Sequence, residues 1–197
     1  MPSAQYQPER YFVTPTPHVP NSPLPVLLYR NVLPSDPTAE TAQKTIEKNK
    51  WLKGGVFKHY PGHHFHCQRN ERFELTLALT AVTHECYAVF QGSSHLLLGR
   101  GPIDEPEGGI EVDVETGDII ILPAGVAHCS LHSSDDYTYM GLYPEGSPHW
   151  DNNFCQADAG ETAEKARNAR GVPVPDHDPI FGLDGPLVEI WRKAAAV

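Results

Sequence analysis

The hydrophobic and polar positions of this chain follow mainly the period of β-strands. Residues 110–115 alternate strictly between apolar and acidic side chains, and a period of two predicts a half-buried antiparallel strand. Residues 119–122 are apolar throughout, which predicts a buried strand. Further strands are predicted at residues 24–29, 55–60, 73–79, 86–90, 95–98 and 137–143. Strands at intervals of about ten residues, joined by glycine turns, favour a sandwich or a barrel.

One segment in the first third of the chain has the period of a helix. Ala39, Ala42 and Ile46 recur at the spacing of one helix face. We expect Asp36 to be the N-cap and Pro37 to lie in the first turn. This helix is predicted to pack on the outside of a sheet.

The two ends of the chain differ from the middle in composition. Residues 1–23 are rich in proline and polar residues, which predicts an extended N-terminal arm. Residues 24–150 are expected to form a single domain, and residues 151–197 a C-terminal arm that packs back on it. Within that C-terminal arm, residues 157–170 are a candidate for a short exposed helix.

Composition and charge exclude several classes of partner. The 197 residues are 40% hydrophobic and 20% charged, as is ordinary for a soluble globular protein, and the formal net charge is −10. This charge disfavours nucleic acid and anionic membranes as partners. The chain has no secretory signal pattern and no apolar run near the roughly 18 residues of a membrane span. With four cysteines that are expected to be free thiols, it is predicted to be cytoplasmic.

A dozen residues in the second half combine a strand, a turn and a histidine. Gly117-Asp118 predicts a tight turn, because glycine tolerates positive φ and Asp hydrogen-bonds to nearby backbone. Residues 119–122 are the buried strand, and Pro123-Ala124-Gly125 ends that strand. His128 then begins the next strand, where small β-barrels place metal ligands or substrate contacts.

A second histidine pattern lies earlier in the chain. In His64-x-His66 both side chains point to the same face of a strand. Glu85 can add a carboxylate and His128 a third imidazole. Three histidines and one carboxylate suit a divalent transition metal such as Fe, Mn, Ni or Zn, and open coordination positions would admit a small-molecule substrate or dioxygen.

These two stretches resemble the two signatures of the cupin family. The second signature is matched by Gly117, Pro123, Gly125 and His128, although His132 stands where the family has an asparagine. The first is a His-x-His pair, three or four residues, a glutamate, six residues and a glycine. His64, His66, Glu85 and Gly92 supply its fixed positions.

The first signature is interrupted. Residues 67–84 separate His66 from Glu85, which is fourteen more than the family pattern allows. If residues 67–80 were deleted, the remainder would fit the family. Either this segment is a genuine loop that keeps the ligands together, or it is an untranslated segment included in the protein sequence by error.

The order of other segments is similar to that of small single-domain cupins. The matching segments are Leu24 to Arg30, Ala124 to His128, Tyr143 to Gly146 and Asp178 to Gly182. A weaker similarity is to cupin-domain oxidoreductases of fungal polyketide pathways. The resemblance implies an all-β, cupin-type jelly-roll β-barrel with one flanking helix and Pro/Gly-rich arms, forming a homodimer. It also implies a metal-dependent oxidoreductase of secondary metabolism that acts on a small aromatic or polyketide-derived metabolite.

Other interpretations stay open at this point. A non-redox isomerase or epimerase would use a histidine as base and Tyr137, Tyr139 or Tyr143 as acid. A metal-free binding barrel with a disabled site is the third hypothesis. We expect His84 to be a structural partner of Glu85 and not a ligand, and both His95 and His132 to be exposed or structural.

Overall fold

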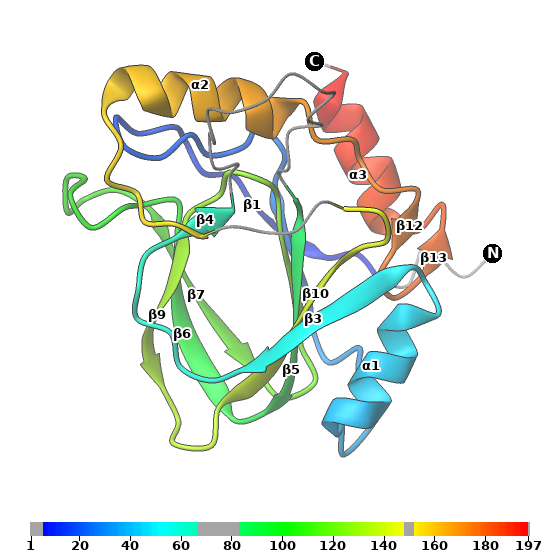
Figure 1. Ribbon diagram of the computed structural model, residues 1–197. Coiled ribbons are helices and arrows are strands. Elements are labelled where there is room, and N and C mark those ends of the chain that lie inside the picture. Colours follow the sequence, from blue (N-terminus) through cyan, green and yellow to red (C-terminus); the bar gives the residue numbers. More distant parts are fainter. Residues whose placement is uncertain (1–5, 67–82, 148–151, 197) are drawn as a thin grey trace, which may run out of the picture.

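The structure is a computed structural model that describes residues 6–66, 83–147 and 152–196 (Figure 1). The helices are α1 (Ala39–Glu47), α2 (Ala159–Arg170) and α3 (Pro186–Ala195). The strands are β1 (Glu9–Tyr11), β2 (Val26–Tyr29), β3 (Trp51–Phe57), β4 (Phe65–His66), β5 (Glu85–Gln91), β6 (Ser93–Leu98), β7 (Ile110–Glu115), β8 (Ile119–Leu122), β9 (His128–Ser133), β10 (Thr138–Pro144), β11 (Asn152–Asn153), β12 (His177–Asp178) and β13 (Gly182–Leu183). None of the helices in these ranges is long and apolar enough to cross a lipid bilayer.

Two facing sheets make up most of the molecule (Figure 1). The larger has the strand order β1-β2-β8-β5-β10-β3, and the smaller has the order β7-β6-β9. His64, which immediately precedes β4, forms an antiparallel bridge with His128, the first residue of β9. From β5 to β10 the chain passes repeatedly from one sheet to the other. The prediction of a mainly β fold is therefore confirmed.

The closed barrel expected from the sequence is not seen in the described ranges. There, no strand of the six-stranded sheet pairs with a strand of the three-stranded sheet. The sheets instead meet through side chains, and β8 is buried along its whole length because both its faces are covered. The sandwich interior contains, among others, Val26, Leu28, Tyr87, Val89, Leu96, Leu98, Val112, Val114, Ile120, Leu122 and Tyr139.

The outer face of the large sheet is covered by helices. Ala42 and Ile46 of α1, and Leu187 and Trp191 of α3, pack with the outward side chains of β2, β5, β8 and β10. The Trp191 indole N–H also donates to the Pro25 carbonyl at 2.9 Å. Burial on both faces explains why the central strands are almost wholly apolar.

The helices differ from the prediction in three respects. The N-cap of α1 is Thr38 and not Asp36, because Asp36 has a positive φ of 51° whereas Thr38 is extended and accepts from the Thr41 amide. The second helix is present, but Lys165 and Ala169 on it are buried. The third, α3, lies in a segment predicted to be an irregular arm. Its Pro186 stands in the first turn of the helix, where proline is well tolerated.

Two of the segments predicted at the sequence level can be compared only in part. Within the predicted N-terminal arm, β1 pairs antiparallel with β2 and so adds a strand to the large sheet. The predicted strand at 73–79 and the insertion at 67–80 lie outside the described residues.

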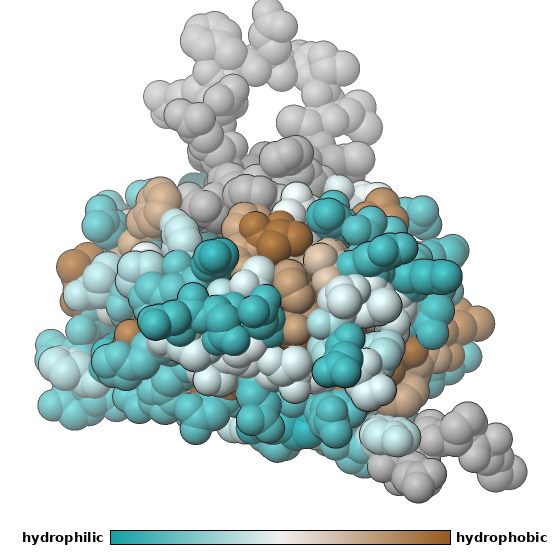
Figure 2. Space-filling view, turned by 90° about the horizontal axis from the view of Figure 1, so that it is seen from below, coloured by the Kyte–Doolittle hydropathy of each residue, from teal (hydrophilic) through white to brown (hydrophobic). Residues whose placement is uncertain are grey.

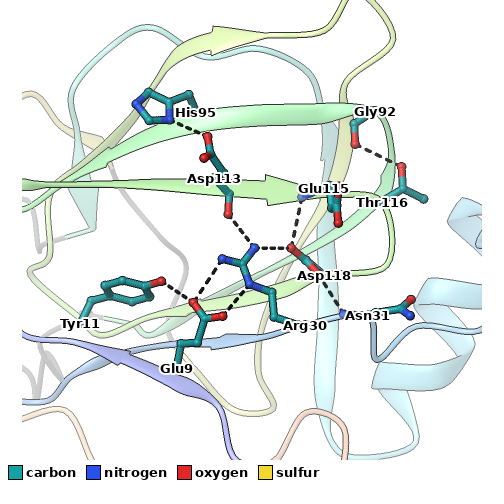
Figure 3. A network of polar contacts seen from close by, with 10 residues as sticks. All are labelled: Glu9, Tyr11, Arg30, Asn31, Gly92, His95, Asp113, Glu115, Thr116 and Asp118. Carbon is teal, nitrogen blue, oxygen red and sulfur yellow. Dashed lines mark hydrogen bonds and ion pairs between the residues drawn. The ribbon is translucent and has the colours of Figure 1, made fainter.

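A buried carboxylate fixes the turn that leads into β8 (Figure 3). Asp118 is 1% exposed. Its Oδ2 accepts from Arg30 at 2.8 Å and its Oδ1 accepts from the Asn31 backbone N–H at 2.9 Å. Arg30 also pairs with Glu9 of β1 at 2.8 Å. This network ties the ends of β1 and β2 to the turn, and it sets the position of the strand and histidine that follow.

Polar side chains dominate the end of the sandwich that is seen from below. This surface is mainly hydrophilic, with apolar side chains gathered in small areas (Figure 2).

A second buried carboxylate holds the C-terminal region against the sheet. Asp178 is fully buried. Its Oδ2 accepts from the Tyr29 hydroxyl at 2.5 Å and the Leu187 amide at 3.0 Å. Its Oδ1 accepts from the amides of Ile180 and Phe181 at 2.8 and 3.0 Å. All of these donors are buried or half-buried. If the carboxylate were absent, they would lose their hydrogen-bond acceptor in a place that water reaches poorly.

We therefore expect Asp178→Asn to lower the free energy of unfolding by roughly 2–4 kcal/mol, because an amide NH₂ would face N–H donors. Urea unfolding of the purified protein measures this loss. The matched control is Asp176→Asn, which removes an exposed ion pair with Arg192 and should cost less than about 1 kcal/mol. Equal losses in the two variants would contradict this account.

Candidate metal centre

Three potential ligands meet between the two sheets. One ligating atom each from His64, Glu85 and His128 lies within 4.8 Å of the others. All three residues are buried, with exposed fractions of 6%, 3% and 3%. They come from three segments that are far apart in the sequence, so only the fold brings them together.

Backbone pairing places the two histidines side by side. The His64 N–H donates to the His128 carbonyl at 3.2 Å, and the His128 N–H donates to the His64 carbonyl at 2.9 Å. Residues that are directly opposite in an antiparallel pair project their side chains to the same face. The two imidazole centroids are accordingly 4.3 Å apart.

The alternation of β5 turns Glu85 toward the histidines. Glu85 is opposite Leu122, the last residue of β8. Leu122, Tyr87 and Val89 belong to the interior between the sheets, whereas Cys86 and Ala88 belong to the core beneath the helices. Because side chains alternate along a strand, Glu85 points into the interior with Tyr87. Its Oε2 lies 3.4 Å from the His128 Nε2.

Backbone carbonyls orient both imidazoles. The His64 Nδ1 is 3.0 Å from the Gly62 carbonyl, and the His128 Nδ1 is 3.0 Å from the Val126 carbonyl. A carbonyl only accepts, so in each ring Nδ1 carries the proton and donates. This assigned tautomer puts the lone pair on Nε2, the arrangement by which proteins commonly orient metal-binding histidines.

A tyrosine contacts the carboxylate from the other side. The Tyr143 hydroxyl donates to the Glu85 Oε1 at 2.6 Å. Burial, and next the charge of Glu85, raise the pKa of Tyr143 far above its usual range. Tyr143 is therefore a neutral donor at physiological pH. The two carboxylate oxygens thus face different neighbours, Oε1 toward Tyr143 and Oε2 toward His128.

Aromatic rings surround the histidines. Tyr60 meets His64 edge-on with centroids 4.7 Å apart, and Tyr87 meets His128 edge-on at 5.5 Å. Tyr139 packs on Tyr87 at 4.1 Å. Burial raises the pKa of both Tyr87 and Tyr139, so both hydroxyls are protonated near neutral pH. The site therefore combines a polar centre with a largely aromatic wall.

The donor set fits a divalent transition metal. Imidazole nitrogen and carboxylate oxygen are the ligands that Zn, Fe, Mn and Ni accept. Two histidines and one carboxylate are also the set used by non-haem iron sites with open coordination positions. The burial of all three groups and the fixed tautomers agree with such a role.

The structure places three of the four predicted ligands together. His66 belongs to β4, where its backbone pairs with Asn152. Its side chain lies outside what the structure describes. His66 as a fourth ligand remains a prediction from the His-x-His spacing.

His84 faces the opposite side of the sheet from Glu85, so the expected pairing of the two is wrong. The His84 Nδ1 accepts from the Ala124 N–H at 3.0 Å, and its Nε2 donates to the Pro173 carbonyl at 3.3 Å. The ring packs on Trp191 at 4.6 Å. Complete burial lowers the pKa of His84 to about 4. His84 is thus a neutral structural residue that joins the sheet to the C-terminal region.

The remaining histidines near the signatures lie away from the centre. His95 contacts Asp113 at 2.6 Å and Glu111 at 2.8 Å on the exposed side of the small sheet, and hydrogen bonds to these carboxylates raise its pKa. His132 is exposed at the register position opposite His95. Both histidines therefore lie away from the candidate metal centre, as the sequence predicts for both.

The sequence did not predict that Tyr143 contacts Glu85. Tyr143 was identified only as one of three candidate acids. The alternation of Tyr139, Gly141 and Tyr143 on β10 indicates that they share the inner face. Which of them reaches Glu85 depends on the register of β10 against β5, and no sequence pattern gives that register.

Comparison with known proteins gives limited further information. No family model matches the chain. The chain is 28% identical over 186 residues to a Bacillus subtilis (strain 168) protein described as "Uncharacterized protein YjlB", covering 94% of this chain and 97% of that protein. A solved structure of RmlC from Streptococcus suis in complex with dTDP-D-xylose aligns over 74% of this chain and 73% of that one, with 12% identity and a TM-score of 0.35. A TM-score this low establishes no common fold, so the strand order and the site geometry carry the arguments below.

Because His84 is buried and neutral, we expect the folded protein to lose stability as the pH falls. The unfolded chain would bind a proton at His84 below its ordinary pKa of 6.5, while the folded protein does so only below about 4. Stability should therefore fall as pH decreases from 6.5 to 4, by about 3 kcal/mol from this residue.

Urea unfolding at several pH values tests this effect. In the His84→Gln variant, the free energy of unfolding should depend less steeply on pH between 6.5 and 5 than in the wild type. This holds whether the variant is more or less stable than the wild type overall. The control, His95→Gln, should keep the acid-side loss, because the pKa of His95 is shifted upward. Parallel slopes in the wild-type and His84→Gln proteins would refute the assignment.

Proposed function

We propose that this chain is a cupin-type, metal-dependent enzyme that acts on a small molecule. His64, Glu85 and His128 would hold a divalent transition metal, with His66 as the fourth ligand. The observation that carries the proposal is the convergence of three buried ligating atoms within 4.8 Å.

Electrostatics supports a bound cation. An ionised carboxylate loses its hydration when it is buried, and this loss is costly unless positive charge or strong hydrogen bonds offset it. Glu85 is 3% exposed, and its Oε1 accepts a hydrogen bond from the Tyr143 hydroxyl. A divalent ion coordinated by Oε2 and the two Nε2 lone pairs would offset this cost.

The strand order supports the cupin-type fold. Four strands of the large sheet run in the order β3-β10-β5-β8. The small sheet has the order β9-β6-β7, and the isolated bridge between His64 and His128 places the segment just before β4 beside β9. These two strand orders, with the β4 segment beside β9, match the double-sheet arrangement of the jelly roll, which cupins use.

The reaction we favour is an oxidation of an aromatic or polyketide-derived metabolite. A metal at this site would supply Lewis-acid polarisation and open positions for substrate or dioxygen. The protein's own part is binding and orientation: Tyr60 and Tyr87 offer ring faces and edges beside the two histidines. Such a wall suits a flat, weakly polar substrate.

An isomerase or epimerase is the second candidate, and the protonated tyrosines favour it. Tyr87 and Tyr139 keep their protons at neutral pH because of burial, and Tyr87 adjoins His128. A phenol and an imidazole that meet from the two facing sheets can act as an acid and base pair. This reaction would need no dioxygen.

Two further features belong to the same proposal. We expect a homodimer, as the resemblance to cupins implies, and a cytoplasmic location. We also expect a small-molecule substrate, which the interior position of the site supports, and no nucleic-acid or membrane partner, which the net charge of −10 disfavours.

Metal content tests the site directly. The purified protein should contain about one transition-metal ion per chain by elemental analysis, and His128→Ala should lose it, because one ligand and its fixed lone pair are gone. His132→Ala is the matched control: it removes an exposed histidine from the same strand and should retain the metal.

Three other outcomes would change the proposal. Metal in neither the wild type nor any variant would indicate a binding protein with a disabled site. Equal loss of metal in both histidine variants would contradict the assignment of ligands. Metal only in a variant that lacks residues 67–80 would mean that this segment prevents binding in the full chain.

Oxygen dependence separates the two reaction classes. The metal-loaded protein should consume dioxygen when catechol or a simple 1,3-diketone is supplied, and His128→Ala should not. These probes represent aromatic and polyketide-like substrates. Conversion of a probe under strict anaerobiosis, without oxygen uptake in air, would favour the isomerase candidate instead.

A further inference from the structure

We propose that Tyr143 is a positioning residue, which holds Glu85 so that the carboxylate presents Oε2 alone to the metal. This inference rests on the proposed metal site and extends it. It assigns a role to a residue outside the predicted ligand set, and it states how Glu85 binds, through one oxygen.

The direction of the two carboxylate oxygens carries the argument. The Tyr143 hydroxyl donates to Oε1 at 2.6 Å. Oε2 faces the His128 Nε2 at 3.4 Å. The hydrogen bond from the phenol uses one of the two lone pairs of Oε1 and holds this oxygen on the side of Tyr143, away from His128. The same oxygen is therefore poorly placed to share an ion with the two imidazoles.

Two glycines make room for this pair. A side chain at Gly54 on the neighbouring strand β3 would bring a Cβ within 2.3 Å of the Tyr143 ring. A Cβ at Gly141 would lie 3.3 Å from the Glu85 Oε1 and 3.0 Å from the Phe57 ring. The space that the tyrosine and the carboxylate occupy thus depends on absent side chains on both β3 and β10.

The hydrogen bond between Tyr143 and Glu85 fits a role in orienting a metal-binding carboxylate better than a role in core packing alone. Glu85 is the first residue of β5, and a glutamate side chain has several rotatable bonds. Hydrogen bonds from outer residues orient metal-binding carboxylates, and their loss commonly costs 10- to 100-fold in metal affinity. A hydroxyl that merely satisfied a buried carboxylate would affect folding stability without changing the geometry around the ion.

The experiment uses Co(II) alone as the probe, because its visible spectrum reports the number and geometry of its ligands. The full-length wild type, Tyr143→Phe and Tyr139→Phe are titrated with Co(II) in competition with a chromogenic chelator. Tyr139→Phe is the matched control, since it deletes a hydroxyl from the same face of β10 two residues from Gly141. Thermal unfolding of the metal-free proteins reports folding separately.

We expect Tyr143→Phe to weaken Co(II) binding by roughly 10- to 100-fold and to change the spectrum at full loading, as Glu85 becomes free to bind through both oxygens. Tyr139→Phe should keep the wild-type affinity and spectrum. Gly54→Ala, which retains the hydroxyl but displaces the ring, should reproduce the Tyr143→Phe spectrum. It serves as the test if Tyr143→Phe fails to fold.

Failure of the inference differs from failure of the proposed function. If the wild type binds Co(II) and Tyr143→Phe matches it in affinity and spectrum, Tyr143 has no positioning role and the metal site stands. A lowered unfolding temperature with an unchanged spectrum would also overturn the inference, because the role would be structural only. If the wild type binds no Co(II), both the metal site and the inference are wrong.

Discussion

The backbone bridge between His64 and His128 is the contact on which the candidate site depends. Two hydrogen bonds join residues from separate signatures, at the edge of the smaller sheet. Because side chains alternate along strands, a slip of one residue would turn one imidazole away from the other. Both histidines and this strand register are therefore needed to bring the two imidazole rings together. Their ring centroids are 4.3 Å apart in this register.

Strand β5 is covered on both faces, and this packing fixes the position of Glu85, the third candidate ligand. One face of the strand looks into the sandwich and the other lies beneath α1 and α3. Adjacent residues therefore meet opposite environments. His84 is a neutral link between the sheet and the C-terminal region, while Glu85 lies among polar and aromatic groups. A ligand on a strand packed on both sides is held more firmly than one on a loop.

Polar groups inside a mainly apolar sandwich are tolerable only when each has a suitable neighbour. Here the carbonyls of Gly62 and Val126 orient the imidazoles, and Tyr143 orients the carboxylate. Such networks are rigid when fully satisfied and costly when broken. The same logic applies at Asp118 and Asp178, whose buried carboxylates fix a turn and the C-terminal region instead of a metal.

The sequence by itself determined the mainly β class, most of the longer strands and the set of candidate ligands, because these follow from local period and from fixed spacing. It did not predict the short strands β1, β11, β12 and β13, and it placed β3 at residues 55–60 where the structure has Trp51–Phe57. It did not determine α3, since Gly185 and Pro186 indicate an irregular arm until the apolar face of the helix meets the sheet. It could not show that Thr38 replaces Asp36 as N-cap, which depends on a local positive φ. Nor could it show that Tyr143 reaches Glu85. Strand register and the packing of distant segments decide such contacts, and neither is a property of any short stretch of sequence.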